Sequence, residues 1–397
     1  RNFFTAMGLF GVGTAIAAAA PTFEVLLAAR IVQALGTAVM LPLLFTTVMQ
    51  VVAPERRGRT MGLVTIVTAA APALGPTVSG VIVSSLGWRW IFLLVLPVAL
   101  LAIAAGAVWL RNVTPTAPAR FDPLSVVLSA IGFSGVIYGL ASIGEGSTAG
   151  IPSWIPITAG VVALVLLATR QLALRHTDRV LLDIRVFSGR LFTLSTITVV
   201  IVSIALFGSL ILLPLYIQQV LGEPAYVAGL MLLPGGLLSG ILAPFVGMAY
   251  DKVGPRALIL PGAVVVTGAM AAFSTLGPAT PVWLVIGMHV LLSIGTALMM
   301  TPLMTTALGS VPPHLYPHAS AIVNTLQQVS GAAGTALFIT LFSVAAAGSS
   351  AEPATLAAGV GTAFAVGAGI SALGIVLAPF LRRPAVASAT SADGADR

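Results

Sequence analysis

Long apolar runs follow one another along most of the chain, and short polar segments separate them. Each run has about 20 residues or more, the length that a helix needs to cross the roughly 30 Å hydrocarbon core of a membrane. The pattern predicts an all-α polytopic membrane protein with twelve membrane-spanning helices. We expect them at residues 3–20, 23–52, 60–86, 90–110, 123–143, 152–173, 191–217, 225–250, 257–276, 281–307, 320–345 and 354–381.

The composition supports this fold class. Hydrophobic residues make up 58% of the 397 positions and charged residues only 7%, with a mean hydropathy of +1.08, far outside the range of soluble domains. The chain has no cysteine, which excludes disulfides, thiol catalysis and zinc bound by cysteine. Four scattered histidines lack the spacing of a metal site, so we expect no metal.

The basic residues mark one side of the membrane. The net charge is +7, but the 17 arginines and one lysine do not form a basic stretch with interleaved aromatic residues, so we expect no nucleic-acid partner. With residue 1 in the cytoplasm, Arg89 is the one loop cation outside, in agreement with the positive-inside rule. Four glutamates, Glu24, Glu145, Glu223 and Glu352, then also lie outside. The loop cations placed inside are Arg56, Arg57, Arg59, Arg111, Arg120, Arg170, Arg175, Arg179, Arg185, Arg190, Lys252, Arg256, Arg382 and Arg383.

An internal repeat links the two ends of the chain. The segments APERRGRTMGLV (53–64) and VPPHLYPHASAIV (311–323) both place a proline-containing loop before a helix, and aligning Pro54 with Pro313 gives an offset of 313 − 54 = 259. Applied to Arg190, where the second half starts, this offset puts the start of the first half 69 residues before residue 1. We therefore expect an N-terminally truncated fragment with twelve of fourteen helices, arranged as six, an inserted pair and six.

The repeat predicts four parts. Residues 1–111 form an incomplete N-terminal bundle of four spans, and 112–189 hold the inserted helix pair and an amphipathic cytoplasmic connector. Residues 190–383 form a six-helix bundle, and 384–397 a disordered cytoplasmic tail. Repeated membrane units of this kind are typical of secondary transporters, with the substrate path at the interface between the repeats.

The loop GMAYDKVGPR (Gly247 to Arg256) joins two helices on the cytoplasmic side. Gly247 lets helices approach, Asp251 and the cations Lys252 and Arg256 can pair at helix ends, and Gly254 starts a tight turn. The alternative is an ordinary positive-inside loop. The stretch resembles the G-x-x-x-D-[RK]-x-G-x-[RK] signature of the major facilitator superfamily, which implies a cytoplasmic gate loop.

Arg30 lies about a third of the way into the span 23–52, where a guanidinium costs about 2.5–3.5 kcal/mol unless it faces a bundle interior or water. Gln33 and Thr37 follow at helical spacing and share its face. The alternative is an arginine that snorkels to the outer interface. The stretch resembles the R-x-x-Q-G motif of the superfamily, with Ala34 in place of glycine, and this implies a role for Arg30 and Gln33 in proton coupling.

The span 60–86 contains the stretch ALGPTVSG, in which helix-breaking residues follow one another. Pro72 and Pro76 each remove a helical hydrogen bond, and small or mildly polar residues share one face, which suits close helix contact. The alternative is a kinked packing helix. The stretch resembles the antiporter signature G-x8-G-x3-G-P-x2-G-G, which implies export driven by protons. The matching residues are Gly62, Gly75, Pro76 and Gly80, whereas Ala71 and Ser79 replace two glycines.

Two further segments narrow the resemblance to the fourteen-helix drug:proton antiporter family. WRWIFLLVLP (Trp88 to Pro97) resembles the entry to its sixth helix, and HASAIVNTLQQVSGAAGTAL (His318 to Leu337) its thirteenth helix. Amides within hydrocarbon either hold helices together, at about 0.6 kcal/mol each, or contact substrate. The candidates for a substrate cavity are Thr37, Asn324, Gln327 and Gln328.

No Asp or Glu lies deep within a predicted span, although a proton antiporter needs a group that takes up and releases protons. His289, near the middle of the span 281–307, is the one buried titratable candidate besides Arg30. The alternative is a hydrogen-bonded packing residue. The resemblance implies that the main carboxylate belongs to helices that precede this chain.

These features predict an exporter that moves drug-like amphiphilic compounds outward while protons move inward, by rocking of two helical bundles. Its partners are a small-molecule substrate, protons and lipid; we expect a monomer without cofactors, driven by the proton gradient. The alternatives are a dedicated exporter of one metabolite or antibiotic and a transport-inactive structural or sensory relative. No nucleophile–base pair, paired carboxylates or metal cluster supports a membrane enzyme. We expect residues 1–397 alone to be inactive.

Overall fold

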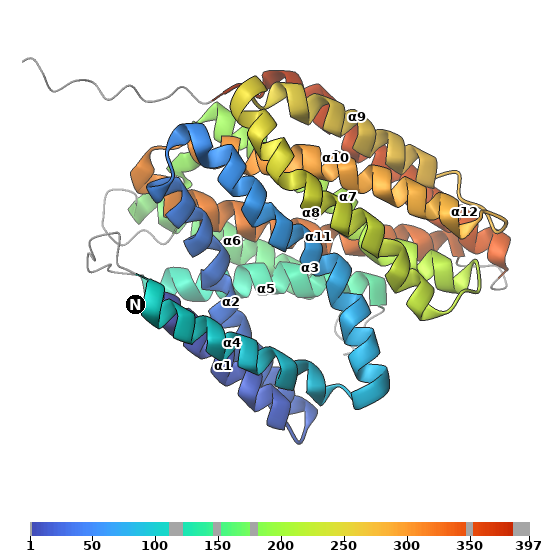
Figure 1. Cartoon of the computed structure of the whole chain (residues 1–397), viewed down its shortest axis with the longest axis horizontal. Coiled ribbons are helices and arrows are strands. Elements are labelled where there is room, and N and C mark those ends of the chain that lie inside the picture. The colour runs from blue at the N-terminus through green and yellow to red at the C-terminus, as the bar shows by residue number, and fades with distance from the viewer. Residues whose placement is uncertain (1, 111–121, 146–151, 175–181, 347–351, 384–397) are drawn as a thin grey trace, which may run out of the picture.

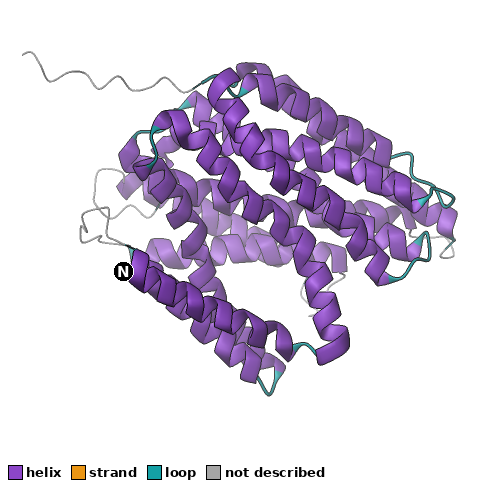
Figure 2. Ribbon diagram, in the orientation of Figure 1, coloured by secondary structure: helices purple, strands orange, loops and turns teal. Residues whose placement is uncertain are grey.

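The computed structural model describes residues 2–110, 122–145, 152–174, 182–346 and 352–383, and within them it is all-helical, without a strand (Figure 2). Each of the twelve predicted ranges overlaps one α-helix. The predicted tail at 384–397 lies outside the described residues. The helices are α1 (Asn2–Ala19), α2 (Phe23–Val51), α3 (Arg57–Leu86), α4 (Arg89–Trp109), α5 (Pro123–Glu145), α6 (Trp154–Leu174), α7 (Arg190–Gln219), α8 (Ala225–Val253), α9 (Arg256–Phe273), α10 (Val282–Gly309), α11 (Tyr316–Ala346) and α12 (Pro353–Leu377), with short 3₁₀ helices η1 (Pro54–Arg56), η2 (Ile184–Ser188), η3 (Pro313–Leu315) and η4 (Ala378–Phe380).

Ten of these helices are long and apolar enough to cross a membrane. The two α-helices outside this group are α3 and α11. Helix α11 carries amide side chains at Asn324, Gln327 and Gln328 in its first half, which lower its hydropathy. The chain is therefore a polytopic membrane protein.

The offset of 259 residues recurs in the helix boundaries. Helix α3 begins at Arg57 and α11 at Tyr316, and each directly follows a three-residue 3₁₀ helix that begins with proline. The starts of α2 and α10 differ by the same number, 282 − 23 = 259. The element order α2–η1–α3 is thus repeated as α10–η3–α11, as the sequence offset predicts.

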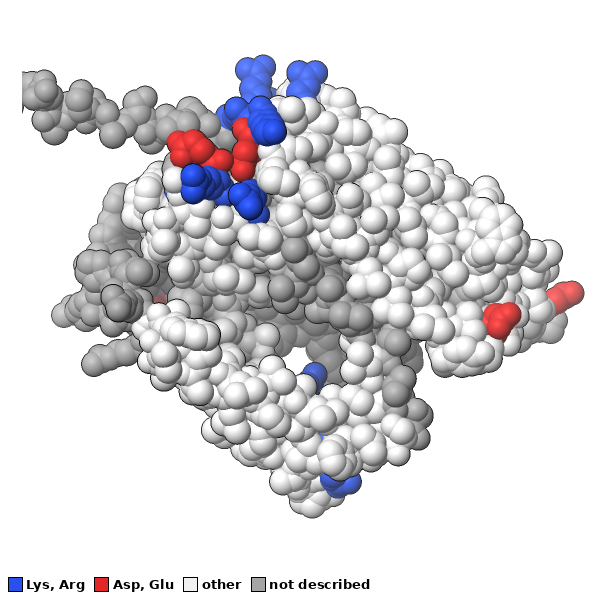
Figure 3. Space-filling view, in the orientation of Figure 1, with Lys and Arg blue, Asp and Glu red and all other residues white. Residues whose placement is uncertain are grey.

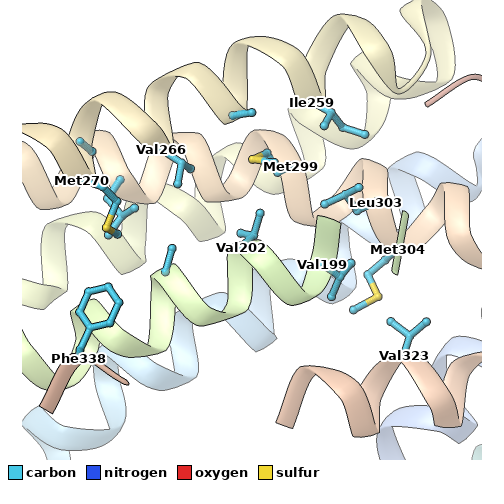
Figure 4. Packing of buried hydrophobic residues seen from close by; sticks show 14 of the residues in the cluster. Val199, Val202, Ile259, Val266, Met270, Met299, Leu303, Met304, Val323 and Phe338 are labelled. Atoms are coloured by element: carbon cyan, nitrogen blue, oxygen red, sulfur yellow. The ribbon is translucent and has the colours of Figure 1, made fainter. Parts of the chain in front are cut away.

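Helices α7 to α12 form the main bundle, and α3 lies alongside it against α8 (Figure 1). Its interior is filled by aliphatic and aromatic side chains, with Val202, Val266 and Met299 directed toward one another from α7, α9 and α10 (Figure 4). Helices α1 and α4 pack on each other in a separate layer, and α5 pairs with α6 and also packs on α11. Helices α2 and α3 join the α1–α4 layer to the main bundle, because α2 packs on α1 and α11, and α3 packs on α4 and α8.

Charged side chains gather at one end of the molecule. Consecutive helices run in alternating directions, so the starts of α3, α9 and α11 share an end with the end of α8 (Figure 1). Lysine, arginine, aspartate and glutamate side chains cluster over this end (Figure 3), which is called the cation-rich end below. The basic residues there that lie in or beside the described helices include Arg56, Arg57, Arg59, Arg185, Arg190, Lys252, Arg256, Arg382 and Arg383.

Candidate functional site

A cavity of about 910 Å³ lies between α1, α2 and α4 on one side and α11 on the other. Figure 3 shows the molecule hollowed between the α1–α4 layer and the main bundle. Six of the predicted site residues come together on its wall: Arg30, Gln33, Thr37, Asn324, Gln327 and Gln328. The rest of the lining is Phe10, Ile31, Ala34, Ala38, Leu41, Pro42, Ile91, Phe92, Val95, Ala321 and Thr325.

Arg30 is held by a chain of hydrogen bonds that runs from α2 into α1. Its Nη1 donates to Oε1 of Gln33 at 2.7 Å, Nε2 of Gln33 donates to Oγ1 of Thr14 at 2.8 Å, and Thr14 donates to the Phe10 carbonyl at 2.7 Å. Gln33 is 7% exposed and Thr14 is fully buried, whereas Arg30 is exposed to the cavity. The guanidinium also lies 5.9 Å from the ring centre of Phe92.

Thr14 is a site residue that the sequence analysis missed. It meets Gln33 because α1 and α2 approach closely: a β-carbon added at Gly13 would lie 2.5 Å from the backbone nitrogen of Gln33. The stretch GVGT, in which glycines precede the threonine, was the available signal, since such small residues mark close helix contacts.

The amides of α11 form the opposite wall. Asn324 donates through Nδ2 to the Ser320 carbonyl at 2.8 Å, while no protein partner of Gln327 or Gln328 is found among the described residues. A different face of α11 packs on α7, where Gly334 meets the backbone of Ile204. These amides therefore lie on the cavity wall and not at the interface with α7.

The cation-rich end is closed by contacts between α3 and α8. The carboxylate of Asp251, in the last turn of α8, accepts from the backbone N–H groups of Gly58 (3.0 Å) and Arg59 (3.1 Å) in the first turn of α3. A β-carbon added at Gly58 would clash with the Asp251 carboxylate, and one added at Gly247 would clash with the Gly58 carbonyl. Asp251 thus caps a helix from the other half of the repeat.

The other residues of the predicted gate loop divide into two groups. Gly254 has φ +83°, a left-handed conformation that favours glycine, and the aliphatic part of Arg383 lies against it. Arg383 also donates to the backbone carbonyls of Tyr250 (3.3 Å) and Asp251. Lys252 and Arg256 are exposed, and the described residues show no ion pair between either of them and Asp251.

Two further contacts join α2 and α3, from the first half of the repeat, to α11, from the second half, near the cation-rich end. Arg57 donates through Nη1 to the Tyr316 hydroxyl at 3.4 Å. Its Nη2 donates to the Met49 carbonyl in the last turn of α2, and its Nε donates to the carbonyl of Val52, which directly follows α2. Thr46 of α2 and Ser320 of α11 share a hydrogen bond of 3.2 Å. Arg57 and Tyr316 are separated by 259 residues, so the repeat brings its own equivalent positions into contact.

The antiporter-signature residues are distributed along α3, which continues as one helix through Pro72 and Pro76. Gly62 packs on α8, where an added β-carbon would clash with the Ala243 carbonyl, whereas the space at Gly75 is open. The surroundings of Pro76 and Gly80 lie outside what the structure describes.

His289 does not join the cavity wall. It is 3% exposed between α10 and α8, where its ring lies against Gly235, and its Nδ1 has no protein partner in the described part of the chain. The structure therefore places the two titratable candidates, Arg30 and His289, in different parts of the molecule.

A buried polar network anchors α5 and α6. Asp122 precedes α5, accepts from the Ser125 backbone N–H at 3.0 Å and pairs with Arg170 of α6 through Nε (2.5 Å) and Nη2 (2.8 Å). The guanidinium holds the pKa of Asp122 well below its usual 3.8. Gln171 donates to the Ser125 hydroxyl and accepts from the Leu182 N–H, which attaches the segment before η2. Arg170 and Gln171 thus lie in the last two turns of α6, although Arg170 is counted among the loop cations in the sequence-based topology.

Comparisons with known proteins identify the family of this chain. The profile of the major facilitator superfamily matches residues 1–335. The lincomycin resistance protein LmrB of Listeria monocytogenes is 40% identical over 380 residues, which cover 94% of this chain and 80% of that protein. LmrB of Bacillus subtilis is 40% identical over 390 residues, covering 94% and 79%. A multidrug resistance protein B homologue of Mycobacterium tuberculosis is 30% identical over 349 residues, covering 86% and 63%.

The solved structure of the human organic anion transporter MFSD10 has the same fold. Its TM-score with this chain is 0.59 at 17% identity, and the match covers 95% of this chain and 76% of that one. The superfamily profile extends over most of the chain, and the all-helical fold with its internal repeat agrees with it. The chain therefore belongs to the major facilitator superfamily, and it is a membrane transporter, not an enzyme.

Proposed function

We propose that this transporter exports drug-like amphiphilic compounds across the cytoplasmic membrane in exchange for protons. Relatives that are 40% identical to this chain are named lincomycin resistance proteins, and a further one is named a multidrug resistance protein B homologue. These names support the efflux of toxic compounds. The assignment of the cation-rich end to the cytoplasm rests on the positive-inside rule.

The observation that carries the proposal is the Arg30–Gln33–Thr14 chain on the wall of a mostly apolar cavity. The apolar lining suits a drug-like body, and the guanidinium is a fixed charge in a place of low polarity. An arginine keeps its own proton at physiological pH, so it contributes to proton coupling by stabilising the deprotonated form of a nearby proton carrier. The described cavity wall contains no carboxylate that could be this carrier.

The contacts at the cation-rich end support alternating access. Asp251 and the Gly58–Gly247 approach close the molecule on the side that we assign to the cytoplasm, so this arrangement corresponds to a closed inner gate. Export then requires these contacts to break and an outer closure to form, by rocking of the two halves.

Within the superfamily, we assign the chain to the fourteen-helix drug:proton antiporters with a 6+2+6 arrangement. The support is the repeated order α2–η1–α3 and α10–η3–α11 together with the α5–α6 pair between the halves.

The proposal is tested in everted membrane vesicles that contain the full-length protein. We expect a fluorescent drug-like compound to accumulate only when the vesicle interior is acidic, and the Arg30→Ala variant to reduce the rate about 10- to 100-fold, the effect of losing charged hydrogen bonds. Arg89→Ala is the matched control, because Arg89 donates to the Ala20 carbonyl in a loop and does not line the cavity.

The outcomes separate the alternatives. Proton-dependent movement of one compound from a broad panel would indicate a dedicated exporter. The absence of movement for every compound, in protein that reaches the membrane and remains folded, would instead identify a transport-inactive relative.

A further inference from the structure

We propose that the cavity contains a recognition site for an oxyanion, so that the substrate is an amphiphilic organic anion, most simply a carboxylate on an apolar ring system. The site is the free edge of the Arg30 guanidinium, with the amides of Gln327 and Gln328 on the facing wall. This inference rests on the proposed function, since it names the substrate class of the same cavity.

The Phe10 carbonyl determines which atom donates and which accepts in the hydrogen bonds that link Thr14, Gln33 and Arg30. Thr14 has a single hydroxyl hydrogen and donates it to the Phe10 carbonyl, so towards Gln33 its oxygen is an acceptor. The Gln33 amide must therefore turn its NH₂ group to Thr14 and its oxygen to Arg30. Because Thr14 is fully buried and Gln33 is only 7% exposed, water competes little for these two hydrogen bonds, and the amide keeps its oxygen towards Arg30.

The hydrogen bonds that run through Gln33 to Thr14 use only one nitrogen of the Arg30 guanidinium. Nη1 donates to Gln33, whereas no protein acceptor for Nε or Nη2 is present among the described residues. A guanidinium with two free adjacent nitrogens matches the two oxygens of a carboxylate in a bidentate arrangement. Gln33 fixes the group from behind, so the free donors remain available to a molecule in the cavity.

The described wall of the cavity carries positive charge and no negative charge. Arg30 is the one charged side chain on the described lining, and the polar groups around it are hydroxyls and amides. A cationic ligand would meet an uncompensated guanidinium at low polarity, where the repulsion between the two charges is poorly screened. An anion instead compensates the charge, while Phe92, Ile91 and Leu41 offer apolar contact to its ring system.

The test measures equilibrium binding to the full-length protein in lipid nanodiscs, without a proton gradient, with three fluorescent probes of one ring system. The probes are 9-anthracenecarboxylate, its carboxamide and 9-(aminomethyl)anthracene. We expect the carboxylate to bind at least about tenfold more tightly than the other two, the smallest ratio that charge-assisted hydrogen bonds bring. Empty nanodiscs give the partition into lipid, which is subtracted.

The Arg30→Gln variant should bind all three probes with similar affinity, whereas the matched Arg89→Gln variant should keep the preference. Equal or tighter binding of the amine by the unmodified protein would overturn the proposal, and so would a carboxylate preference that survives Arg30→Gln in a variant with unchanged thermal stability. Because no gradient is used, this result is independent of whether proton-driven export is found.

Thr14 is tested as a positioning residue. Thr14→Val removes the acceptor of Gln33 without a change of size, frees the amide to rotate and should reduce the carboxylate-to-carboxamide affinity ratio severalfold. Thr14→Ser should restore the ratio. If Thr14 had a purely structural role, Thr14→Val would lower the affinity for the carboxylate and for the carboxamide by the same factor. That outcome would contradict its assignment as a positioning residue.

Discussion

The carboxylate of Asp251 stabilises a helix to which it does not belong. Gly58 and Arg59 are in the first turn of α3, whose N–H groups have no acceptor inside their own helix. Asp251 supplies one from α8, and its negative charge also faces the positive end of the α3 dipole. The cap exists only while α3 and α8 are in contact, so its free energy stabilises the closed arrangement alone.

Asp251→Asn should therefore favour opening at the cation-rich end. The variant keeps an acceptor but loses the charge, which should shift the equilibrium by about 1 kcal/mol, or roughly fivefold. The chain lacks cysteine, so a single Thr46→Cys reporter behind the contact can be labelled with a water-soluble maleimide.

We expect labelling to become roughly fivefold faster in the Asp251→Asn background, in proportion to the open population. Lys252→Gln is the control, because Lys252 is an exposed neighbour of Asp251 that forms no ion pair among the described residues. Equal labelling in both backgrounds would show that the cap does not bias the closed state.

At the residue scale, the sequence predicts only what one helix contains. Arg30, Gln33 and Thr37 share a face because of helical spacing, and the structure places all three on the cavity wall. Thr14 and the partners of Asp251 belong to other helices. The glycines of GVGT mark a close helix contact beside Thr14, but the sequence does not show which helix it meets.

At the scale of elements, apolar length alone predicts the twelve helices, because a membrane sets the minimum length of each. The helix ends depend on longer-range contacts. Helix α3 begins at Arg57, three residues before the predicted start at 60, in the turn that Asp251 caps. Helix α6 extends to Leu174 and includes Arg170, whose partner Asp122 precedes α5.

Asp122→Asn should lower the melting temperature of the protein in nanodiscs at neutral pH and remove a step in its acid dependence. The folded-state pKa of Asp122 is depressed, so its pairing with Arg170 stabilises the fold fully above the ordinary pKa of 3.8, and this stabilisation is lost as the pH falls below that value.

A series of melting curves from pH 7 down to ~pH 2, well below the ordinary pKa of 3.8, checks this prediction. The exposed residue Glu55 provides the control, because Glu55→Gln should retain the acid step. An unchanged acid step in Asp122→Asn would mean that other carboxylates produce it.

At the scale of the whole molecule, the sequence offset predicts a repeat but not which surfaces meet. The structure shows that α2 and α3 face α11 and α8 at the cation-rich end. This arrangement depends on side chains that are hundreds of residues apart in the sequence, such as Arg57 and Tyr316, which are in contact across the offset of 259.

A disulfide between Thr46→Cys and Ser320→Cys should lock the closed arrangement. The two hydroxyl oxygens lie 3.2 Å apart, on α2 and α11, so sulfur atoms at the same two positions start close to each other. We expect the oxidised double variant to lose transport in vesicles and dithiothreitol to restore it.

Each single cysteine variant should keep its activity under oxidation, which separates locking from the loss of the hydroxyl. Retained transport in the fully oxidised double variant would show that α2 and α11 need not separate during the cycle.

Hydrogen exchange at the cap of α3 also reports the rate at which the two halves separate. The amide protons of Gly58 and Arg59 are bonded across the two halves, so each can exchange with deuterium only during the intervals in which the halves are apart. Deuterium uptake at these two positions then reports how often the unmodified protein opens, and a compound that arrests the cycle with the halves together would be recognised by the slowing of that uptake.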